Sequence, residues 1–136
     1  MSKYNAKKVE YRGEIFDSKF ELTFFIYLQE LEKQGKISNL DRQKSYELLP
    51  RQTDSKGKFL YHPVLYKSDF EYDIQGVHKT IDTKGILTPD FRLKQKLFYY
   101  VFKRKIECVK LKEAKKDELF SKIDKKMKQY FKSVGV

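Results

Sequence analysis

The segment from Ser68 to Gly85, with the sequence SDFEYDIQGVHKTIDTKG, constrains the fold of this chain more than any other. Polar and apolar residues alternate on both sides of Gly76, which predicts two strands joined by a tight turn. Glycine supplies the backbone freedom that such a turn needs. Because neighbouring side chains of a strand point to opposite faces, three carboxylates are expected on one face of the first strand: Asp69, Glu71 and Asp73.

The second strand carries Asp82 and Lys84 two positions apart, so both side chains should point the same way. If the strands pair as neighbours, Asp69 and Asp82 converge, with Lys84 and the carbonyl of Thr83 beside them. Carboxylate oxygens suit Mg²⁺, and a cation there can activate water and neutralise charge at phosphorus while a lysine orients the water. The residues therefore indicate a divalent-metal phosphodiesterase site. In the alternative interpretation, the two aspartates only form ion pairs across a sheet, which add little stability.

The length of 136 residues predicts a single domain, and the composition of 40% hydrophobic and 36% charged residues is typical of a globular protein. The net charge of +11 favours a polyanionic partner, most commonly nucleic acid. Lysines are spread along the chain and no apolar run could span a bilayer, so a membrane partner is not expected. With no signal peptide at the N-terminus and only one cysteine, Cys108, a cytoplasmic location is expected.

The remaining pattern alternates helices and strands. Residues 1–10 are expected to form a mobile arm, and apolar residues at helical spacing predict a helix from Asp17 or Ser18 to Gly35. Strands are expected around 37–40, at 45–49, across 59–66 with a break at Pro63, and at 106–111. Thr88 and Pro89 predict the start of a second helix, and residues 117–134 predict an amphipathic, basic C-terminal helix. The chain is therefore expected to be an α/β protein with a mixed sheet flanked by helices.

Glu21 has two interpretations that the pattern leaves open. Ser18 and Glu21 fit the S-x-x-E capping box, in which the glutamate bonds back to the start of its own helix. Alternatively, Glu21 is a third carboxylate directed at the metal. The two roles exclude each other only in part, because a glutamate at a helix start could change partners when metal binds.

The helix that follows the hairpin is strongly basic. Its position after the second strand would make it a surface that tracks phosphates, although it could also be only a solvated face. The residues concerned are Arg92, Lys94, Lys96, Lys103 and Arg104. Two further interpretations concern the hairpin itself: Glu71 and Asp73 are expected to be solvated or paired with lysines, and His78, near the turn, is expected to be a surface residue.

The spacing from Asp69 to Asp82-Thr83-Lys84 resembles the signature of the PD-(D/E)XK nucleases, with Ser68 in place of the usual proline. FDSKFE at residues 16–21 resembles the first-helix glutamate motif of the branch that contains the TnsA transposase subunit and the phage endonuclease I Holliday-junction resolvases. Residues 38–48 and 81–98 are similar to segments of a family of small phage nuclease-like proteins. The resemblance covers about residues 11–110.

The resemblance implies a restriction-endonuclease-like fold and a role for each matching residue. Glu21, Asp69, Asp82 and the carbonyl of Thr83 would bind Mg²⁺ or Mn²⁺, and Lys84 would be the catalytic lysine. Gln43 would be a secondary site residue, although a buried amide at a strand end is an equal interpretation.

The implied function is that of a phage-encoded, Mg²⁺-dependent DNA endonuclease that acts on branched or recombining DNA in the cytoplasm of a bacterial host. Symmetric cleavage of a junction needs two sites, which would suit a homodimer. The alternative is a catalytically silent protein of the nuclease fold that binds DNA or a phage or host protein.

Overall fold

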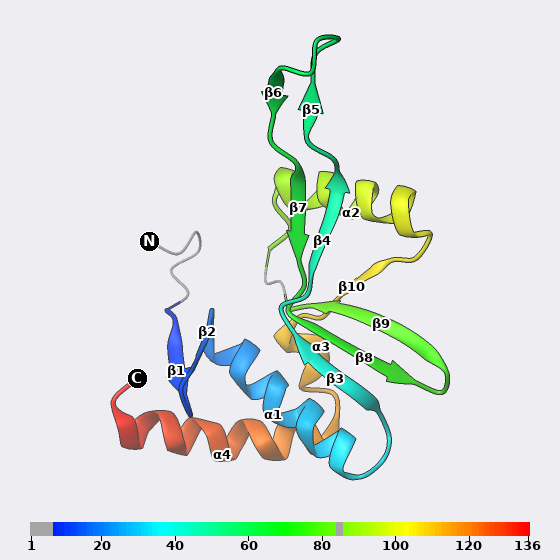
Figure 1. Ribbon diagram of the computed structural model, residues 1–136. Coiled ribbons are helices and arrows are strands. Elements are labelled where there is room, and N and C mark those ends of the chain that lie inside the picture. Colours follow the sequence, from blue (N-terminus) through cyan, green and yellow to red (C-terminus); the bar gives the residue numbers. More distant parts are fainter. Residues whose placement is uncertain (1–6, 84–85) are drawn as a thin grey trace.

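The computed structural model describes residues 7–83 and 86–136 and has a mixed α/β architecture, as the sequence predicts. Its centre is a four-stranded sheet in the order β10-β9-β8-β3, shown in Figure 1. The strands are β3 (Ser38–Arg42), β8 (Phe70–Ile74), β9 (Val77–Asp82) and β10 (Ile106–Cys108). β3 and β9 run antiparallel to β8, whereas β10 runs parallel to β9.

The hairpin predicted from the alternating pattern is β8 and β9. Gln75 and Gly76 form its turn with φ angles of 49° and 77°. Two successive positive φ angles are what a two-residue turn of type I′ requires. The turn fixes the register Phe70↔Ile81, and these two buried side chains lie in the core.

A long bent ribbon extends from the sheet and is called the arm below. It comprises β4 (Ser45–Leu49), β5 (Gln52–Thr53), β6 (Phe59–Tyr61) and β7 (Val64–Lys67). β4 pairs with β7, and β5 pairs with β6 farther out, so the arm projects away from the sheet in Figure 1. The predicted break at Pro63 separates β6 from β7.

Backbone hydrogen bonds join the arm to the sheet where the ribbon bends. The Ser68 N–H donates to the Lys44 carbonyl at 2.9 Å, and the Gln43 N–H donates to the Asp69 carbonyl at 3.2 Å. The Asp69 N–H in turn donates to the Ile81 carbonyl of β9 at 3.1 Å. Asp69 is therefore held by its backbone at the point where the two ladders meet.

Helices cover the ribbon and sheet from different sides. α1 (Lys19–Lys33) packs on the sheet and against α4 (Glu118–Val134), and α2 (Pro89–Phe102) packs on β4 and β10. Side chains of Ser18, Thr88 and Asp117 cap α1, α2 and α4, as expected for these residue types. A short helix, α3 (Leu111–Ala114), replaces the end of the predicted strand 106–111, so β10 is shorter than expected.

The N-terminal segment is partly structured, which corrects the prediction that residues 1–10 are mobile. β1 (Val9–Tyr11) pairs with β2 (Glu14–Phe16), and only 5% of Val9 is exposed. Val9 packs in a cluster with Leu22 of α1 and with Met127 and Phe131 of α4. Residues 1–6 lie outside the described part of the chain.

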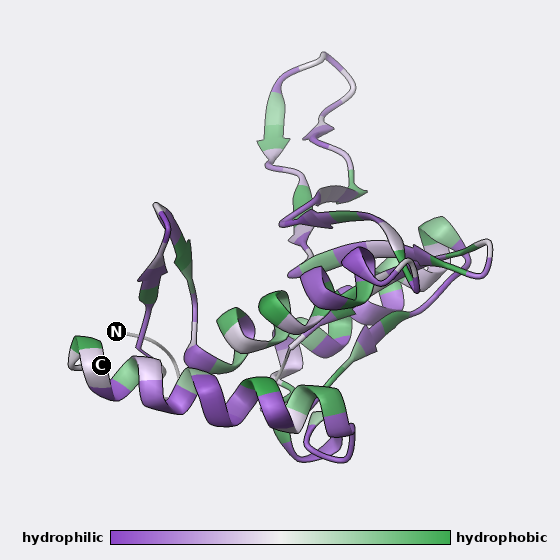
Figure 2. Cartoon of the chain, turned by 90° about the horizontal axis from the view of Figure 1, so that it is seen from below, coloured by the Kyte–Doolittle hydropathy of each residue, from purple (hydrophilic) through white to green (hydrophobic). Residues whose placement is uncertain are grey.

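Among the described residues, three apolar clusters make up the core. One joins α1 to β8 and β9 through Phe24, Leu28 and Phe70, and a second joins α2 to β4 and β7. The third lies between β1–β2, α1 and α4. Figure 2 shows hydrophilic and hydrophobic residues following each other along α4, as predicted for an amphipathic helix. Within the described residues, no helix is long and apolar enough to cross a membrane.

Candidate metal centre

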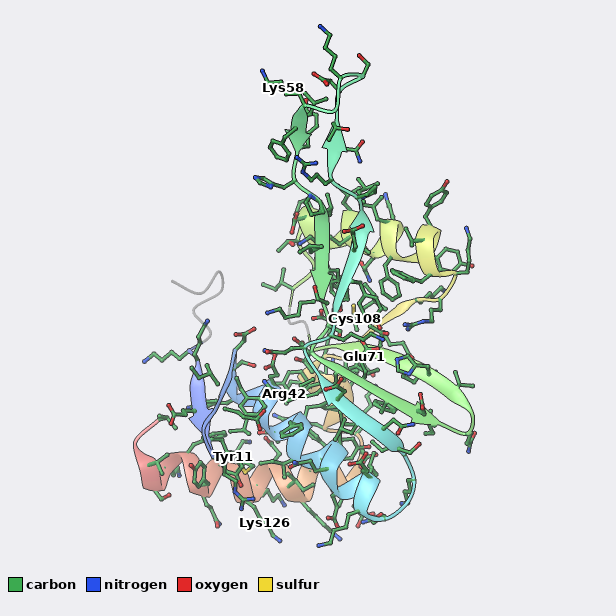
Figure 3. The ribbon with its side chains drawn as sticks, viewed as in Figure 1. Tyr11, Arg42, Lys58, Glu71, Cys108 and Lys126 are labelled. Atoms are coloured by element: carbon green, nitrogen blue, oxygen red, sulfur yellow. The ribbon has the colours of Figure 1, made fainter. Side chains whose placement is uncertain are left out.

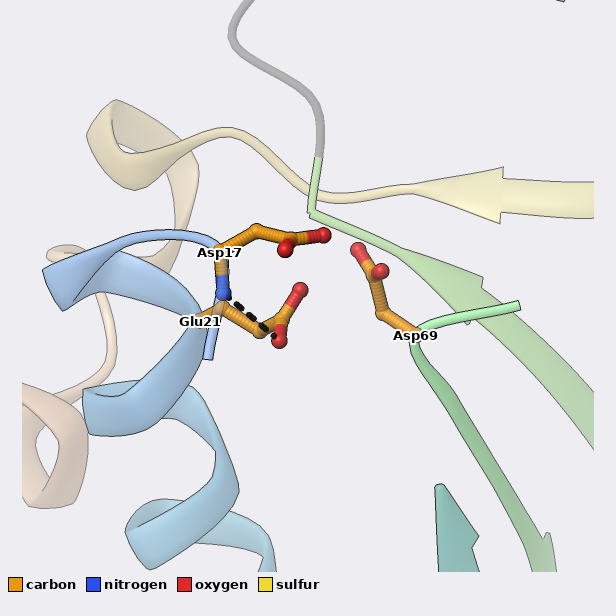
Figure 4. Close-up of side chains that lie close together, drawn as sticks. All are labelled: Asp17, Glu21 and Asp69. Atoms are coloured by element: carbon orange, nitrogen blue, oxygen red, sulfur yellow. Dashed lines mark hydrogen bonds between the residues drawn. The ribbon is translucent and has the colours of Figure 1, made fainter. Parts of the chain in front are cut away.

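Three carboxylates meet where the arm bends into the sheet. Asp17 and Glu21 come from the start of α1, and Asp69 comes from the residue before β8. One oxygen from each lies within 4.8 Å of the other two, as Figure 4 shows. Asp17 is exposed, whereas only 2% of Glu21 is. We call these residues the carboxylate cluster.

The start of α1 shows that both interpretations of Glu21 hold in part. The Ser18 Oγ accepts a hydrogen bond from the Glu21 N–H at 3.0 Å, which is one half of a capping box. The other half is absent in its usual form, because the Glu21 Oε2 accepts from the Asp17 N–H at 3.3 Å. Glu21 therefore accepts a hydrogen bond from the residue before the N-cap, while its carboxylate also faces Asp69.

Thr83 fixes the orientation of the Asp69 carboxylate. The Thr83 N–H and the Thr83 hydroxyl both donate to the Asp69 Oδ2 at 2.7 Å. The Asp69 Oδ2 is thus engaged at the end of β9. Thr83 contacts the cluster as a donor to Asp69, a role that the sequence did not suggest.

The electrostatics of the cluster favour a cation. The pKa of Glu21 is raised to about 8, first by burial, then by the charge and hydrogen bonding of Asp69 and by the charge of Asp17, while the bond from the Asp17 N–H lowers it. A carboxyl group that resists ionisation next to two other carboxylates shows an excess of negative charge at the site. A divalent cation would relieve that excess.

Arg42, at the end of β3 and labelled in Figure 3, brings a positive charge to the cluster. Its guanidinium donates to Glu14 at 2.9 Å, lies 3.8 Å from the ring centroid of Phe16 and reaches Glu21 at only 3.4 Å. The last distance is long for a charge-assisted hydrogen bond. Arg42 therefore neutralises the cluster only in part.

Asp82 is not one of the three carboxylates of the cluster. It is 1% exposed, and its Oδ2 accepts a hydrogen bond from the Tyr66 hydroxyl of β7 at 2.8 Å. Burial and then the Asp82 charge raise the pKa of Tyr66 above its ordinary value, so the phenol remains a donor. Asp82 is thus fixed beside the cluster by the arm.

Two further predicted site residues have different outcomes. Lys84 lies outside the described residues. Gln43 is exposed and has a positive φ angle of 55°, so the alternative interpretation of a buried strand-end amide is wrong. Its contact with the site is the backbone bond to the Asp69 carbonyl.

A second group of polar residues is buried within the hairpin, where solvated carboxylates were expected. Only 1% of Glu71 is exposed, and its Oε1 accepts from the Tyr46 hydroxyl at 2.6 Å and the Thr80 hydroxyl at 3.0 Å. The His78 Nε2 lies 2.6 Å from the Glu71 Oε1, and the His78 Nδ1 lies 2.6 Å from the Asp73 Oδ1. The interpretation of Glu71 as solvated or lysine-paired is therefore wrong, because the arm and the second strand supply its partners. The His78 side chain is 36% exposed, so it lies partly at the surface as expected.

The basic residues after the hairpin separate into two kinds. Arg92, Lys96 and Lys103 are exposed, and Lys94 lies 3.6 Å from Asp90 in its own helix. Arg104, however, donates to Thr80 and to Tyr46 and stacks near Phe98. The half-buried Arg104 is thus already bound to the buried polar group, which sets it apart from the exposed cations of α2.

The cluster fits a hard divalent cation in the nature of its donors. Carboxylate oxygens on a capped helix and at the end of a hairpin are ligands that Mg²⁺ and Mn²⁺ accept, and Mg²⁺ keeps several waters as its remaining ligands. The sequence interpretation had missed Asp17. Its position next to the N-cap Ser18 was the available signal, because residues flanking a cap lie at the same helix end as Glu21.

Comparison with known proteins gives one finding about the family. The family model described as "Protein of unknown function (DUF1064)" matches residues 1–122. Comparisons with curated proteins and with solved structures give no match. Because the matched segment covers most of the chain and includes the whole carboxylate cluster, the protein belongs to the DUF1064 family.

Proposed function

We propose that the protein is a Mg²⁺- or Mn²⁺-dependent DNA endonuclease of the PD-(D/E)XK type with a restriction-endonuclease-like core. The observation that carries the proposal is the carboxylate cluster, in which Glu21 from the first helix faces Asp69 from the hairpin. The sequence resemblance pairs the same two residues. Acidic residues that met only by chance at the surface would all stay solvated, whereas only 2% of Glu21 is exposed.

Each residue of the proposed site would have a distinct part in this function. Asp17, Glu21 and Asp69 would hold the cation, which supplies an activated water and neutralises charge at the scissile phosphate. Thr83 keeps Asp69 in place through its two hydrogen bonds. Asp82 would act from beside the cluster, and Lys84 would stabilise negative charge on the phosphate.

The substrate class follows from charge. A net charge of +11 and the exposed cations Arg92, Lys96 and Lys103 favour the phosphate backbone of DNA, with little readout of sequence. Branched or recombining DNA, a phage origin, a homodimer and the cytoplasm of a bacterial host are the finer parts of the proposal, and they rest on the resemblance.

The test is cleavage of a labelled four-way junction, a linear duplex and a single strand in Mg²⁺, Mn²⁺ or EDTA. Wild-type protein should cut in either metal and not in EDTA, and Asp69→Asn and Glu21→Gln should abolish cutting. Glu118→Gln is the matched control, since Glu118 occupies the first turn of α4 and its side chain is 87% exposed. Undiminished cutting by Asp69→Asn would refute the proposed site.

One observation favours a second candidate, a catalytically silent protein that binds DNA or a protein partner. The Asp82 carboxylate, expected to be a principal ligand, bonds to Tyr66 and lies outside the cluster. Tight binding of the junction with no cutting in either metal, at any pH from 6 to 9, would establish this candidate over the enzyme.

A further inference from the structure

The outer end of the arm exposes large apolar side chains. Phe59, Leu60 and Tyr61 of β6 are 38%, 48% and 68% exposed. This end lies farthest from the helices in Figure 1, and Figure 3 shows Lys58 near its tip. Three consecutive exposed apolar residues on a projecting ribbon mark an interaction surface, because soluble proteins rarely leave such patches without a use.

The tip is held in one conformation by its own polar groups. The Asp54 Oδ1 accepts from the N–H groups of Lys56 and Lys58, both at 2.9 Å, and the Asp54 N–H donates to the Lys58 carbonyl at 2.8 Å. A two-stranded ribbon is only marginally stable by itself in water. The Asp54 bonds stabilise the tip and at the same time engage the only carboxylate among residues 50–62.

Planar side chains and cations are interleaved on this end of the arm. The Arg51 guanidinium lies 5.0 Å from the ring centroid of Phe59, and the rings of Phe59 and His62 are 4.7 Å apart. Tyr61 is the most exposed of the aromatic residues there. Arg51, Lys56 and Lys58 add three positive charges to this segment. Exposed rings beside cations are the features with which proteins stack nucleic-acid bases and contact the flanking phosphates.

We propose that residues 51–62 form a stacking platform that binds the unpaired bases of single-stranded or branched DNA. This inference rests on the proposed function and names the feature of the substrate that the enzyme would recognise. Paired bases are covered by their neighbours in a duplex, so only an unpaired base offers its face to Tyr61 or Phe59. A second copy of the chain suits this surface less well, because its net charge is also strongly positive.

The arm also relates the platform to the carboxylate cluster. Eight residue-to-residue steps along the ribbon separate Tyr61 from Asp69, a distance of at most about 29 Å. This length corresponds to about eight base steps of B-DNA at roughly 3.4 Å each. The platform would therefore hold unpaired bases within about eight nucleotides of the phosphate at the cluster.

The test measures binding in EDTA by fluorescence anisotropy, so that it does not depend on cutting. The probes are a labelled 40-base-pair duplex and the same duplex with a gap of four unpaired nucleotides. The proteins are wild type, Phe59→Ala, Tyr61→Ala and Tyr61→Phe, with Tyr99→Ala as the matched control because Tyr99 of α2 is 51% exposed. Each variant is checked for its oligomeric state by analytical ultracentrifugation.

Wild-type protein should prefer the gapped probe, and Tyr61→Ala should lose at least about fivefold in affinity for it, the low end of the effect of one stacked base. Affinity for the intact duplex should change less than twofold, and Tyr61→Phe and Tyr99→Ala should behave as wild type. Equal affinity of wild type for the two probes, or an equal loss on both probes in Tyr61→Ala, would overturn the platform. A loss that follows dissociation of a dimer would assign the surface to a second copy instead. A protein that shows the predicted binding but never cuts would refute only the proposed enzyme.

Discussion

Replacing Glu21 by Gln should stabilise the metal-free protein. Glu21 is almost fully buried and faces Asp69, so its ionised form is repelled where it lies. Glutamine has nearly the same shape, and its amide oxygen can still accept from the Asp17 N–H. Its amide nitrogen can donate to Asp69. The substitution therefore removes the unfavourable charge while the local hydrogen bonds remain.

The size of the effect follows from the raised pKa. An increase from 4.5 to about 8 corresponds to about 5 kcal/mol of unfavourable interaction in the ionised form. The Arg42 guanidinium at 3.4 Å and the exposed side of the cluster at Asp17 offset part of this. We expect Glu21→Gln to raise the free energy of unfolding by about 2–4 kcal/mol at pH 8.5.

The pH dependence has a definite sign. Below pH 4.5 the carboxyl group is protonated in both the folded and the unfolded chain, so the variant and the wild type should differ little. Between pH 4.5 and about 8 the unfolded chain loses this proton while the folded chain keeps it, so wild-type stability falls relative to the variant as pH rises. Above about pH 8 both states are ionised and the difference becomes constant.

Urea unfolding in EDTA, followed by circular dichroism from pH 4 to pH 9, measures this difference, with Glu118→Gln as the exposed control. Mn²⁺ at saturating concentration should then stabilise the wild type and reverse the order of the two proteins, because binding to the folded state alone adds stability. A Glu21→Gln protein less stable than wild type at pH 8.5 in EDTA would show that Glu21 stabilises the fold as a helix cap. Equal stabilisation of both proteins by Mn²⁺ would remove Glu21 from the ligands.

Four other substitutions test the surroundings of the site by the same unfolding assay, together with duplex binding for the variants of Arg104 and Lys96. Tyr66→Phe should lower the free energy of unfolding by about 1–3 kcal/mol because Asp82 loses a buried donor, and an unchanged value would show that the bond does not orient Asp82. Arg104→Ala should destabilise the protein by about 1–3 kcal/mol with little effect on its affinity for duplex DNA. Lys96→Ala should weaken duplex binding with no effect on stability. The opposite pattern would place Arg104 on the DNA-binding face. Gly76→Ala should cost about 1 kcal/mol, since the φ angle of 77° is unfavourable for alanine, and a neutral result would mean that the hairpin tolerates another turn.

The elements that the sequence predicted well are those determined by neighbouring residues. Thr88 and Pro89 start α2, Ser18 caps α1, and Gly76 forms the hairpin turn, because caps and turns depend on the chemistry of a few adjacent residues. The break at Pro63 belongs to the same class, since proline lacks the N–H that a ladder requires.

The sequence prediction failed where the partners of a side chain come from distant segments. Glu71 looked like a solvated strand carboxylate, yet Tyr46 comes to it from 25 positions away in the chain. Arg104 looked like one of a series of surface cations, yet it follows α2 and turns back to Thr80 and Tyr46. Alternation along a strand assigns a face, but what covers that face depends on how the arm folds over it.

Asp69 of the candidate site was predicted from the sequence, but not all of its partners were. Sequence spacing was sufficient to select Asp69, but not to decide which carboxylates it would meet. The Gln43 N–H donates to the Asp69 carbonyl, the Asp69 N–H donates to the Ile81 carbonyl, and Thr83 donates twice to the Asp69 carboxylate. Both the backbone and the side chain of Asp69 are therefore fixed. The ribbon bends at this residue and leads its side chain to the start of α1, where Asp17 and Glu21 lie. The same ribbon continues outward to the exposed rings of residues 59–61. If the carboxylate cluster and the stacking platform both function, the length of the ribbon between them sets their separation. A two-residue deletion from each of β4 and β7 should therefore shift the preferred cleavage position without changing metal affinity.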